Sequence, residues 1–164
     1  MNDKIKTVCS YLDNLGVAYK KIEHPPAATI EECKKIEEIL NDTICKNLLL
    51  RTTNGSAYYL LILRNDKHFV TSRISKILGS SRLSFTSGEE MENMLNTSPG
   101  SLSILSLIFD KEKKIKLAID RDVIENEYFC CHPCDNSATL KIKSSDILNT
   151  FIPSLGTYPI IIEA

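Results

Sequence analysis

The first part of the chain combines two hydrophobic periods. Over residues 3–15 the apolar positions recur every three or four residues on one helical face, and Gly16 is a natural stop. Residues 17–23 have the pattern of a strand. The motif His24-Pro25-Pro26 ends that strand, because proline lacks an amide donor and restricts the residue before it. The opening pattern therefore predicts a helix, a strand and a turn.

Two capping boxes indicate further helices. In each, a hydroxyl residue precedes a glutamate by three positions, so that both side chains satisfy free backbone amides. Thr29 and Glu32 predict one helix of about ten residues, and Ser87 and Glu90 predict another. A third amphipathic stretch, over residues 71–78, ends at a glycine and is also predicted to be helical.

The strand-like segments are short and several are paired by turns. Apolar runs at 45–52 and 57–63 flank Asn54-Gly55, a strong hairpin signal because both residues tolerate positive φ. A second hairpin is predicted from runs 101–109 and 114–119. The remaining expectations are strands at 82–85, 128–131, 138–142 and 158–162, and a helix at 145–151.

This order of elements favours one mixed α/β domain over residues 1–164. Hairpin-connected strands with inserted helices predict a curved, largely antiparallel, barrel-like sheet with surrounding helices. A chain of this length buries roughly 70% of its unfolded surface, so one core is sufficient without covalent staples.

Composition narrows the class of protein. No apolar run approaches the ~20 residues that span a bilayer, and the polar start does not resemble a signal peptide. We therefore expect a cytoplasmic protein without a membrane partner, in which the six cysteines are reduced thiols. The net charge of −1 argues against a broad nucleic-acid surface but permits a small site for the end of an RNA strand.

Three places in the sequence are candidates for chemistry. Lys46 stands beside a run of three leucines, where a charge is costly unless it has a partner or a task; the alternative is an edge lysine that reaches water. A polar turn entering a strand contains His132, Asn136 and Thr139. The Pro99-Gly100-Ser101 turn can present backbone amides to a carbonyl.

A metal site is an alternative reading of the same turn. Cys131 and Cys134 form one C-x-x-C pair beside His132, whereas a structural zinc site usually has two such pairs. The motifs of P-loop proteins, serine hydrolases, zinc proteases and dinucleotide-binding proteins are absent from the sequence.

The ordered series of motifs resembles the YbaK/prolyl-tRNA editing domain family, specifically its freestanding ProX-type members. The resemblance covers nearly the whole chain. It rests on these segments: Leu15-Gly16-Val17-Ala18-Tyr19, His24-Pro25-Pro26, Thr29 with Glu31-Glu32, Lys46-Asn47-Leu48-Leu49-Leu50-Arg51, Leu78-Gly79-Ser80, Arg82-Leu83-Ser84-Phe85, Pro99-Gly100-Ser101-Leu102-Ser103, Asp120, and His132-Pro133 with Asn136 and Thr139.

The resemblance implies a hydrolase that cleaves a wrongly attached amino acid from tRNA, with alanine on proline tRNA as the favoured substrate. Lys46 matches the essential lysine of the family, and the substrate-binding residues implied are Asn47, Gly100, Ser101, His132, Asn136 and Thr139. No metal or organic cofactor is implied. The expected partners are the aminoacylated 3′ end of tRNA and a prolyl-tRNA synthetase.

Some positions depart from the family pattern and leave the amino acid open. Ile104 and Ser106 stand where the family often has proline and glycine, and Cys131 stands where a larger apolar residue often precedes the histidine. Ala27 and Ala28 are small where bulkier groups often occur. Cysteine- or serine-charged tRNA is therefore an alternative substrate, and a non-catalytic module that binds a tRNA end is an alternative function.

Overall fold

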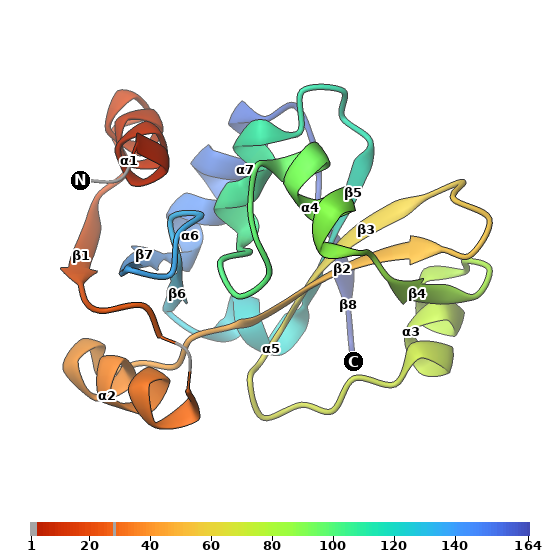
Figure 1. Cartoon of the computed structure of the whole chain (residues 1–164), viewed down its shortest axis with the longest axis horizontal. Helices are drawn as coiled ribbons and strands as arrows, with labels where there is room; N and C mark the ends of the chain where they lie inside the picture. The colour runs from red at the N-terminus through yellow and green to blue at the C-terminus, as the bar shows by residue number, and fades with distance from the viewer. Residues whose placement is uncertain (1–2, 28) are drawn as a thin grey trace.

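The computed structural model describes residues 3–27 and 29–164, and its strands form two sheets (Figure 1). The smaller sheet has the order β1-β7-β6, with β1 at Tyr19–Glu23, β7 at Ala138–Lys143 and β6 at Tyr128–Cys131. Both of its pairings are antiparallel. The two strands predicted on either side of the polar turn are confirmed, and they are neighbours in this sheet.

The larger sheet is mixed. Its order is β4-β2-β3-β5-β8, with β4 at Leu83–Phe85, β2 at Lys46–Thr52, β3 at Tyr58–Leu63, β5 at Ile115–Asp120 and β8 at Ile160–Ile162. β2 is antiparallel to β3 and β4, whereas β5 is parallel to β3 and β8. The predicted hairpin at Asn54-Gly55 is confirmed, with Gly55 at a φ of +73°.

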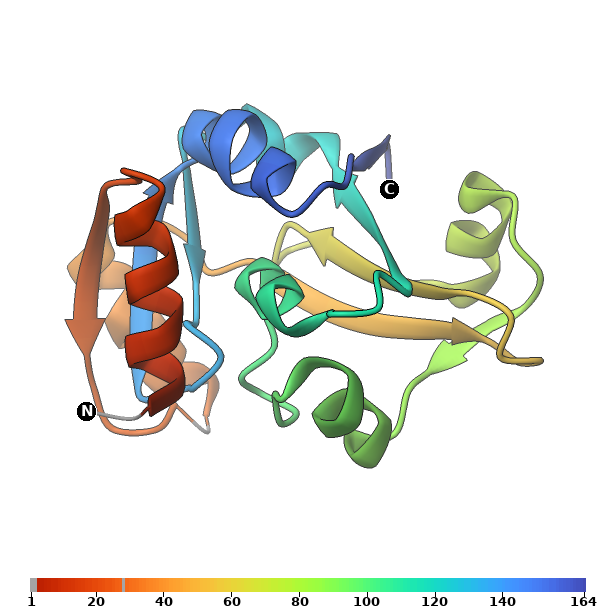
Figure 2. The same cartoon turned by 90° about the horizontal axis from the view of Figure 1, so that it is seen from above.

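The mixed α/β class is confirmed, but the expected barrel-like sheet is wrong. Within residues 3–27 and 29–164, neither sheet closes on itself. A single bridge between Ile44 and Cys130 joins the strand that enters β2 to β6. Seen from above, the two sheets stand side by side rather than around one axis (Figure 2). The hairpin-rich sequence pattern does not distinguish these arrangements, because each uses the same short strands.

The second predicted hairpin is also wrong. Ile104–Phe109 forms a 3-10 helix, η1, and β5 pairs with β3 and β8 instead. Ser103 begins η1, since its hydroxyl accepts from the Leu105 amide while the Ser106 hydroxyl accepts from the Ser103 amide. A short apolar run is compatible with strand or helix, and these serine contacts favour the helix.

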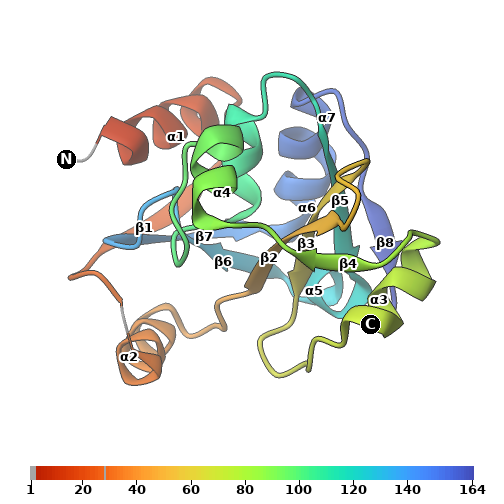
Figure 3. The same ribbon diagram turned by 45° about the vertical axis from the view of Figure 1, so that its right-hand side comes forward.

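The helices cover the sheets on both sides. They are α1 (Asp3–Asn14), α2 (Ile30–Leu40), α3 (Thr71–Leu78), α4 (Gly88–Leu95), α5 (Arg121–Glu125), α6 (Ser144–Asp146), a π-helical turn η2 (Ile147–Phe151) and α7 (Ile152–Ser154). Both predicted capping boxes are present, at the start of α2 and of α4. α1 and α2 lie on opposite faces of the smaller sheet (Figure 3).

Three groups of buried side chains hold these layers together. The largest lies between the sheets, α1, α4 and η1–η2, and includes Leu12, Phe129 and Phe151. A second lies between the larger sheet and α3, around Ile74 and Leu61. A third attaches α2 to the junction of the sheets. In the described part of the chain, no helix has both the length and the apolar character that a membrane crossing requires.

Candidate active site

A cavity of about 230 Å³ lies where the two sheets meet. Its walls come from α2, the start of β2, the loop after β3, the loop before η1 and the turn between β6 and β7. The lining residues are Cys33, Glu37, Ile44, Cys45, Asn47, Asn65, Gly100, Leu102 and His132. Segments far apart in the sequence therefore form one small hollow, with amide, imidazole, carboxylate and thiol groups available to a ligand.

The structure brings three of the predicted site residues to this cavity, namely Asn47, Gly100 and His132. Ser101 is buried behind Gly100, and its amide donates to the Ser98 carbonyl over 3.1 Å. Gly100 has a φ of +88°, a conformation that glycine adopts without strain, and a Cβ there would meet open space. The loop therefore exposes its backbone to the cavity.

The other predicted residues lie around the cavity. Thr139 is buried and contacts His132. Asn136 is half-buried, and its carbonyl accepts a hydrogen bond from the Ala27 amide over 3.3 Å. This contact connects the polar turn to the segment that follows His24-Pro25-Pro26. Ala28 lies outside the described residues.

Lys46 lies at the start of β2, on the opposite face of that strand from Asn47. Successive side chains of a strand point to opposite faces, and Cys45 and Asn47 face the cavity. Lys46 points toward the loop between β3 and α3, where its ammonium donates to the Lys67 carbonyl over 2.8 Å. An ammonium has three N–H donors, so two remain for a ligand. The predicted catalytic lysine is thus next to the cavity but outside its lining.

The Lys67 carbonyl that receives Lys46 is itself held in place. The Lys67 ammonium lies 2.7 Å from a carboxylate oxygen of Asp120 and 2.7 Å from one of Asp122, and it donates to the Ala164 carbonyl over 3.1 Å. Asp120 is completely buried. These contacts anchor the loop after β3 to β5, α5 and the chain end, and so fix the position of Lys46.

His132 is oriented by two polar groups behind it. Its Nδ1 lies 2.8 Å from the Ala138 carbonyl, which has no proton to give, so Nδ1 carries the hydrogen. Burial lowers the pKa of His132, which favours the neutral ring. The neutral ring with a protonated Nδ1 leaves Nε2 as an acceptor. The cavity wall therefore contains an uncharged imidazole with one free lone pair.

A second histidine supports this arrangement. The His24 Nδ1 donates to the Pro25 carbonyl over 2.9 Å, so its neutral form accepts at Nε2. The Thr139 hydroxyl lies 2.8 Å from that Nε2 and 3.3 Å from the His132 Nδ1. In a consistent assignment Thr139 donates to His24, while the His132 Nδ1 hydrogen goes to the Ala138 carbonyl and is shared with Thr139 over the longer contact. The motif His24-Pro25-Pro26 thus contributes to the site through Thr139.

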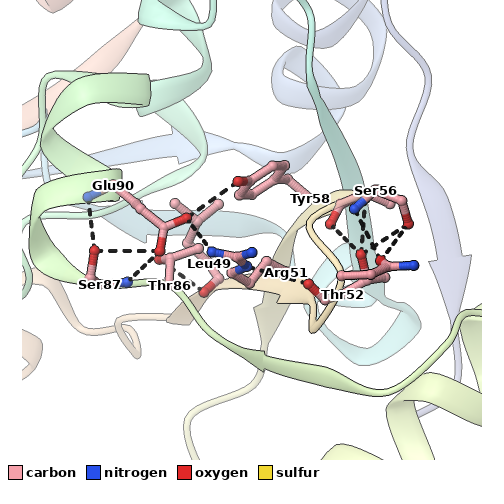
Figure 4. Close-up of polar contacts among 10 residues, drawn as sticks. Leu49, Arg51, Thr52, Ser56, Tyr58, Thr86, Ser87 and Glu90 are labelled. Atoms are coloured by element: carbon pink, nitrogen blue, oxygen red, sulfur yellow. Dashed lines mark hydrogen bonds and ion pairs between the residues drawn. The ribbon is translucent and has the colours of Figure 1, made fainter.

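A polar cluster on the larger sheet positions α4 and the loop after it (Figure 4). The Arg51 guanidinium donates to Glu90 over 3.0 Å, and the Tyr58 hydroxyl donates to the same carboxylate oxygen over 3.3 Å. The other oxygen of Glu90 accepts from the Ser87 amide in the capping box. This cluster joins the β2–β3 hairpin to the start of α4, and the chain after α4 leads to Gly100.

Sequence reasoning missed several lining residues. Cys33 and Glu37 are four positions apart and therefore lie on one face of α2, a spacing that was visible once the capping box predicted that helix. Asn65 comes from the loop after β3, which had no distinctive pattern. Cys45 directly precedes β2 and lines the cavity, because successive side chains alternate in direction and Lys46 points the other way.

The cysteines near the polar turn lie in the core. Cys131 and Cys134 are buried, and burial raises the pKa of both thiols. The Cys134 thiol lies 3.4 Å from the Ser106 hydroxyl. Across residues 3–27 and 29–164, no three His, Cys, Asp or Glu side chains are grouped as metal ligands.

Known proteins are similar to this chain in sequence and in fold. A sequence model of the aminoacyl-tRNA editing domain matches residues 24–150. The chain is 32% identical over 145 residues to the prolyl-tRNA editing protein ProX of Acetoanaerobium sticklandii, covering 88% of each protein. It is 27% identical over 163 residues to the prolyl-tRNA synthetase associated domain-containing protein 1 of Danio rerio, covering 98% of this chain and 88% of that protein.

A solved structure supports the fold independently of the sequence. The crystal structure of a proposed trans-editing enzyme for prolyl tRNA synthetase superimposes with a TM-score of 0.74, covering 100% of this chain and 99% of the other, at 15% identity. The match of the family model to most of the chain and the identity to ProX together decide the family. The chain belongs to the aminoacyl-tRNA editing domain family.

Proposed function

We propose that this protein hydrolyses the ester bond of a mischarged aminoacyl-tRNA, with alanine on proline tRNA as the preferred substrate. The observation that carries the proposal is the cavity at the sheet junction, which combines Asn47, the Gly100 backbone and a neutral His132. The ProX relative is named as a prolyl-tRNA editing protein, which supports proline tRNA as the nucleic-acid partner.

The chemistry needs little beyond orientation and charge stabilisation. An aminoacyl ester is already activated, so its attack by water requires mainly that the developing negative charge on the carbonyl oxygen be stabilised. The Ser101 amide is used by Ser98, so we assign this task to the exposed backbone at Gly100. Water is the nucleophile, and the products are free amino acid and uncharged tRNA.

We assign His132 and Asn47 to the amino acid. The free Nε2 of a neutral His132 can accept a hydrogen bond from the α-ammonium group, and the Asn47 side chain offers donor and acceptor atoms beside it. Asn47 donates to the Cys45 carbonyl over 3.0 Å, which holds its amide near the cavity wall. Ser101, Asn136 and Thr139 then shape and support the pocket rather than contact the ester.

We assign Lys46 to the RNA end. It is the catalytic residue of the proposal, because two of its N–H donors remain and its side chain lies next to the cavity on the side of the loop after β3. From there a positive charge can contact the terminal ribose and stabilise the negative charge that develops at the ester. The positions of Lys46 and Asn47 on opposite faces of β2 place the ribose and the amino acid on separate sides of the strand end.

The size of the cavity favours a small amino acid as the group that is removed. At about 230 Å³ it is below the ~300 Å³ typical of the smallest drug-sized pockets. A synthetase pocket cannot strongly reject a smaller apolar amino acid, because one methylene is worth only ~1–3 kcal/mol. A second pocket that admits alanine and excludes proline corrects this error by hydrolysis.

The test is a comparison of charged tRNAs. Purified protein is incubated with proline tRNA charged with alanine, cysteine, serine or proline, and the remaining aminoacyl-tRNA is measured over time. We expect rapid loss of alanine and retention of proline. Faster loss of cysteine or serine would keep the hydrolase and correct the substrate. Binding of all four without hydrolysis would contradict the enzyme and support a non-catalytic module that holds a tRNA end.

A further inference from the structure

An exposed surface on α3 and β4 combines basic and apolar side chains. We call it the α3 surface and define it by Val70, Arg73, Lys76, Ile77, Arg82 and Phe85, all of which are exposed. α3 and β4 lie at the end of the molecule opposite α1 (Figure 1). Nothing in the proposed hydrolysis uses this surface, so it is open to another role.

The charge of this region differs from that of the whole protein. The chain has a net charge of −1, yet residues 64–82 contain five Lys or Arg residues and one Asp. Within the described residues, Arg73, Lys76 and Arg82 take part in no ion pair. Three unpaired cations on neighbouring elements form an electrostatic site for a polyanion.

The α3 surface also exposes large apolar side chains, which an ordinary charged surface in contact with water does not need. Phe85 is 58% exposed and Val70 50% exposed. The Phe85 ring meets the Phe69 ring edge-on at a centroid distance of 5.3 Å, so an aromatic platform adjoins the cations. Basic groups interleaved with aromatic rings are the combination that binds RNA strands, since phosphates pair with the cations and bases stack on the rings.

The loop between β3 and α3 connects this surface to the cavity. Asn65 at its start lines the cavity, the Lys67 carbonyl in its middle binds Lys46, and Val70 at its end precedes α3. The Lys67 side chain anchors the loop through Asp120 and Asp122. An RNA strand whose 3′ end reaches Lys46 can therefore follow this fixed loop to α3.

The opposite direction is less favourable for RNA. A hollow of about 500 Å³ adjoins the cavity and shares Ile44, Cys45 and Asn65 with it. Four carboxylates line this hollow, from Asp42, Asp66, Asp122 and Glu125. The first three are paired, with Lys141, Arg64 and Lys67 respectively. Among the described lining residues no cation is left unpaired, so this side attracts a polyanion less than the α3 surface does.

We propose that the α3 surface binds the RNA backbone next to the aminoacylated end of the substrate. The inference rests on the proposed function, because it takes tRNA as the substrate, and it adds which part of the protein holds the RNA. The surface supplies affinity and orientation, whereas the cavity supplies the chemistry. Phosphate contacts of this kind position a nucleic acid without reading its sequence.

The test is the double variant R73E/K76E, which reverses two exposed charges and leaves the cavity intact. A matched control is K6E/K111E, which changes the net charge equally at exposed positions on α1 and in the turn before β5. Binding of uncharged proline tRNA is measured over a range of salt concentrations. Deacylation is measured on full-length charged tRNA and on a short aminoacylated oligonucleotide that contains only the 3′-terminal nucleotides.

For R73E/K76E we expect roughly tenfold weaker tRNA binding and a salt dependence smaller by about two phosphate contacts. The KM for full-length tRNA rises in parallel, while kcat and the turnover of the short substrate stay within about twofold of wild type. The control binds and hydrolyses like wild type.

Unchanged tRNA binding by R73E/K76E, or an equal loss in the control, overturns the proposal. A loss that appears only when a synthetase is present also overturns it and assigns the surface to a protein partner. The binding arm needs no catalysis. If the wild type binds tRNA without hydrolysing the ester, the proposed function fails while the comparison of the two variants still decides where the RNA lies.

Discussion

At the scale of single residues, the site depends on how an uncharged His132 is oriented. The ring is fixed by the Ala138 carbonyl and by a hydroxyl of Thr139 that is shared with His24. The hydroxyl is the hydrogen-bond partner of the His24 Nε2, and its removal leaves that nitrogen without this bond, whereas His132 keeps the Ala138 carbonyl. The two histidines and Thr139 therefore act as one unit, although only His132 lines the cavity.

Replacement of Thr139 tests this unit. Thr139→Val keeps the shape and removes the hydroxyl, so we expect a loss of about 1–3 kcal/mol in the free energy of unfolding. If the hydroxyl orients His132 for catalysis, kcat/KM also falls by about ten- to a hundredfold. Thr139→Ser restores the hydroxyl and is expected to recover the rate. An inactive Thr139→Ser, or a fully active Thr139→Val, would contradict the orienting role.

At the scale of elements, α4 connects the larger sheet to the loop that contains Gly100. Glu90 is central to this connection because it closes the capping box of α4 with Ser87 and also binds Arg51 and Tyr58 of the β2–β3 hairpin. The hairpin thereby fixes the start of α4, and α4 fixes the start of the loop. The geometry of the cavity wall thus depends on contacts outside the cavity.

The variant Glu90→Ala removes these contacts together. We expect it to lower the free energy of unfolding by about 1–2 kcal/mol, since it loses a helix cap and a half-buried ion pair. Urea unfolding followed by circular dichroism measures the change. Glu89→Ala, at an exposed position in the same turn, is the control and is expected to stay within about 0.5 kcal/mol of wild type. Equal midpoints for the two variants would refute the role of Glu90.

The elements that the sequence predicts correctly are those with local causes. Capping boxes at Thr29 and Ser87 and the Asn54-Gly55 turn are confirmed, because each is decided by residues a few positions apart. The prediction of a strand at 101–109 was wrong, because apolar residues alone do not distinguish a strand from a short helix. The parallel pairing of β5 with β3 and β8 was missed because pairing between distant strands leaves no local signal.

The candidate site also contains residues that the sequence predicts and residues that it does not. Gly100 and His132 were predicted from polar turns and Asn47 from the family resemblance, and the structure places all three on the cavity. Lys46 and Asn47 lie on opposite faces of β2 because successive side chains of a strand alternate, and this alternation can be deduced from the sequence once the strand is predicted. The contribution of Asn65 depends on the path of the loop after β3, and no residue pattern there specifies that path.

At the scale of the whole molecule, buried thiols make stability depend on pH. Cys130 is fully buried at the sheet junction, and burial raises its pKa from 9.0 to about 12. In the unfolded chain this thiol loses its proton near pH 9, whereas in the folded protein it keeps it. Between these values the unfolded state has released a proton that the folded state still binds, so rising pH favours unfolding.

We therefore expect the free energy of unfolding to decrease above pH 9, with Cys130 contributing about 1.4 kcal/mol per pH unit. Urea unfolding under reducing conditions at pH 8, 9 and 10 measures this slope. The variant Cys130→Ala is less stable overall because it leaves a cavity, but its decrease with pH is expected to be shallower. The same slope in both proteins would show that Cys130 does not cause the pH dependence.

Hydrolysis of alanine-charged proline tRNA, compared between the wild-type protein and Lys46→Ala, tests both the proposed reaction and the role of Lys46. We predict that the wild type releases alanine and that the folded variant is slower by roughly 10²–10³, the loss typical of one electrostatic stabiliser. Equal rates in the two proteins would contradict the role of Lys46, and the absence of alanine release by the wild type would contradict the proposed reaction itself.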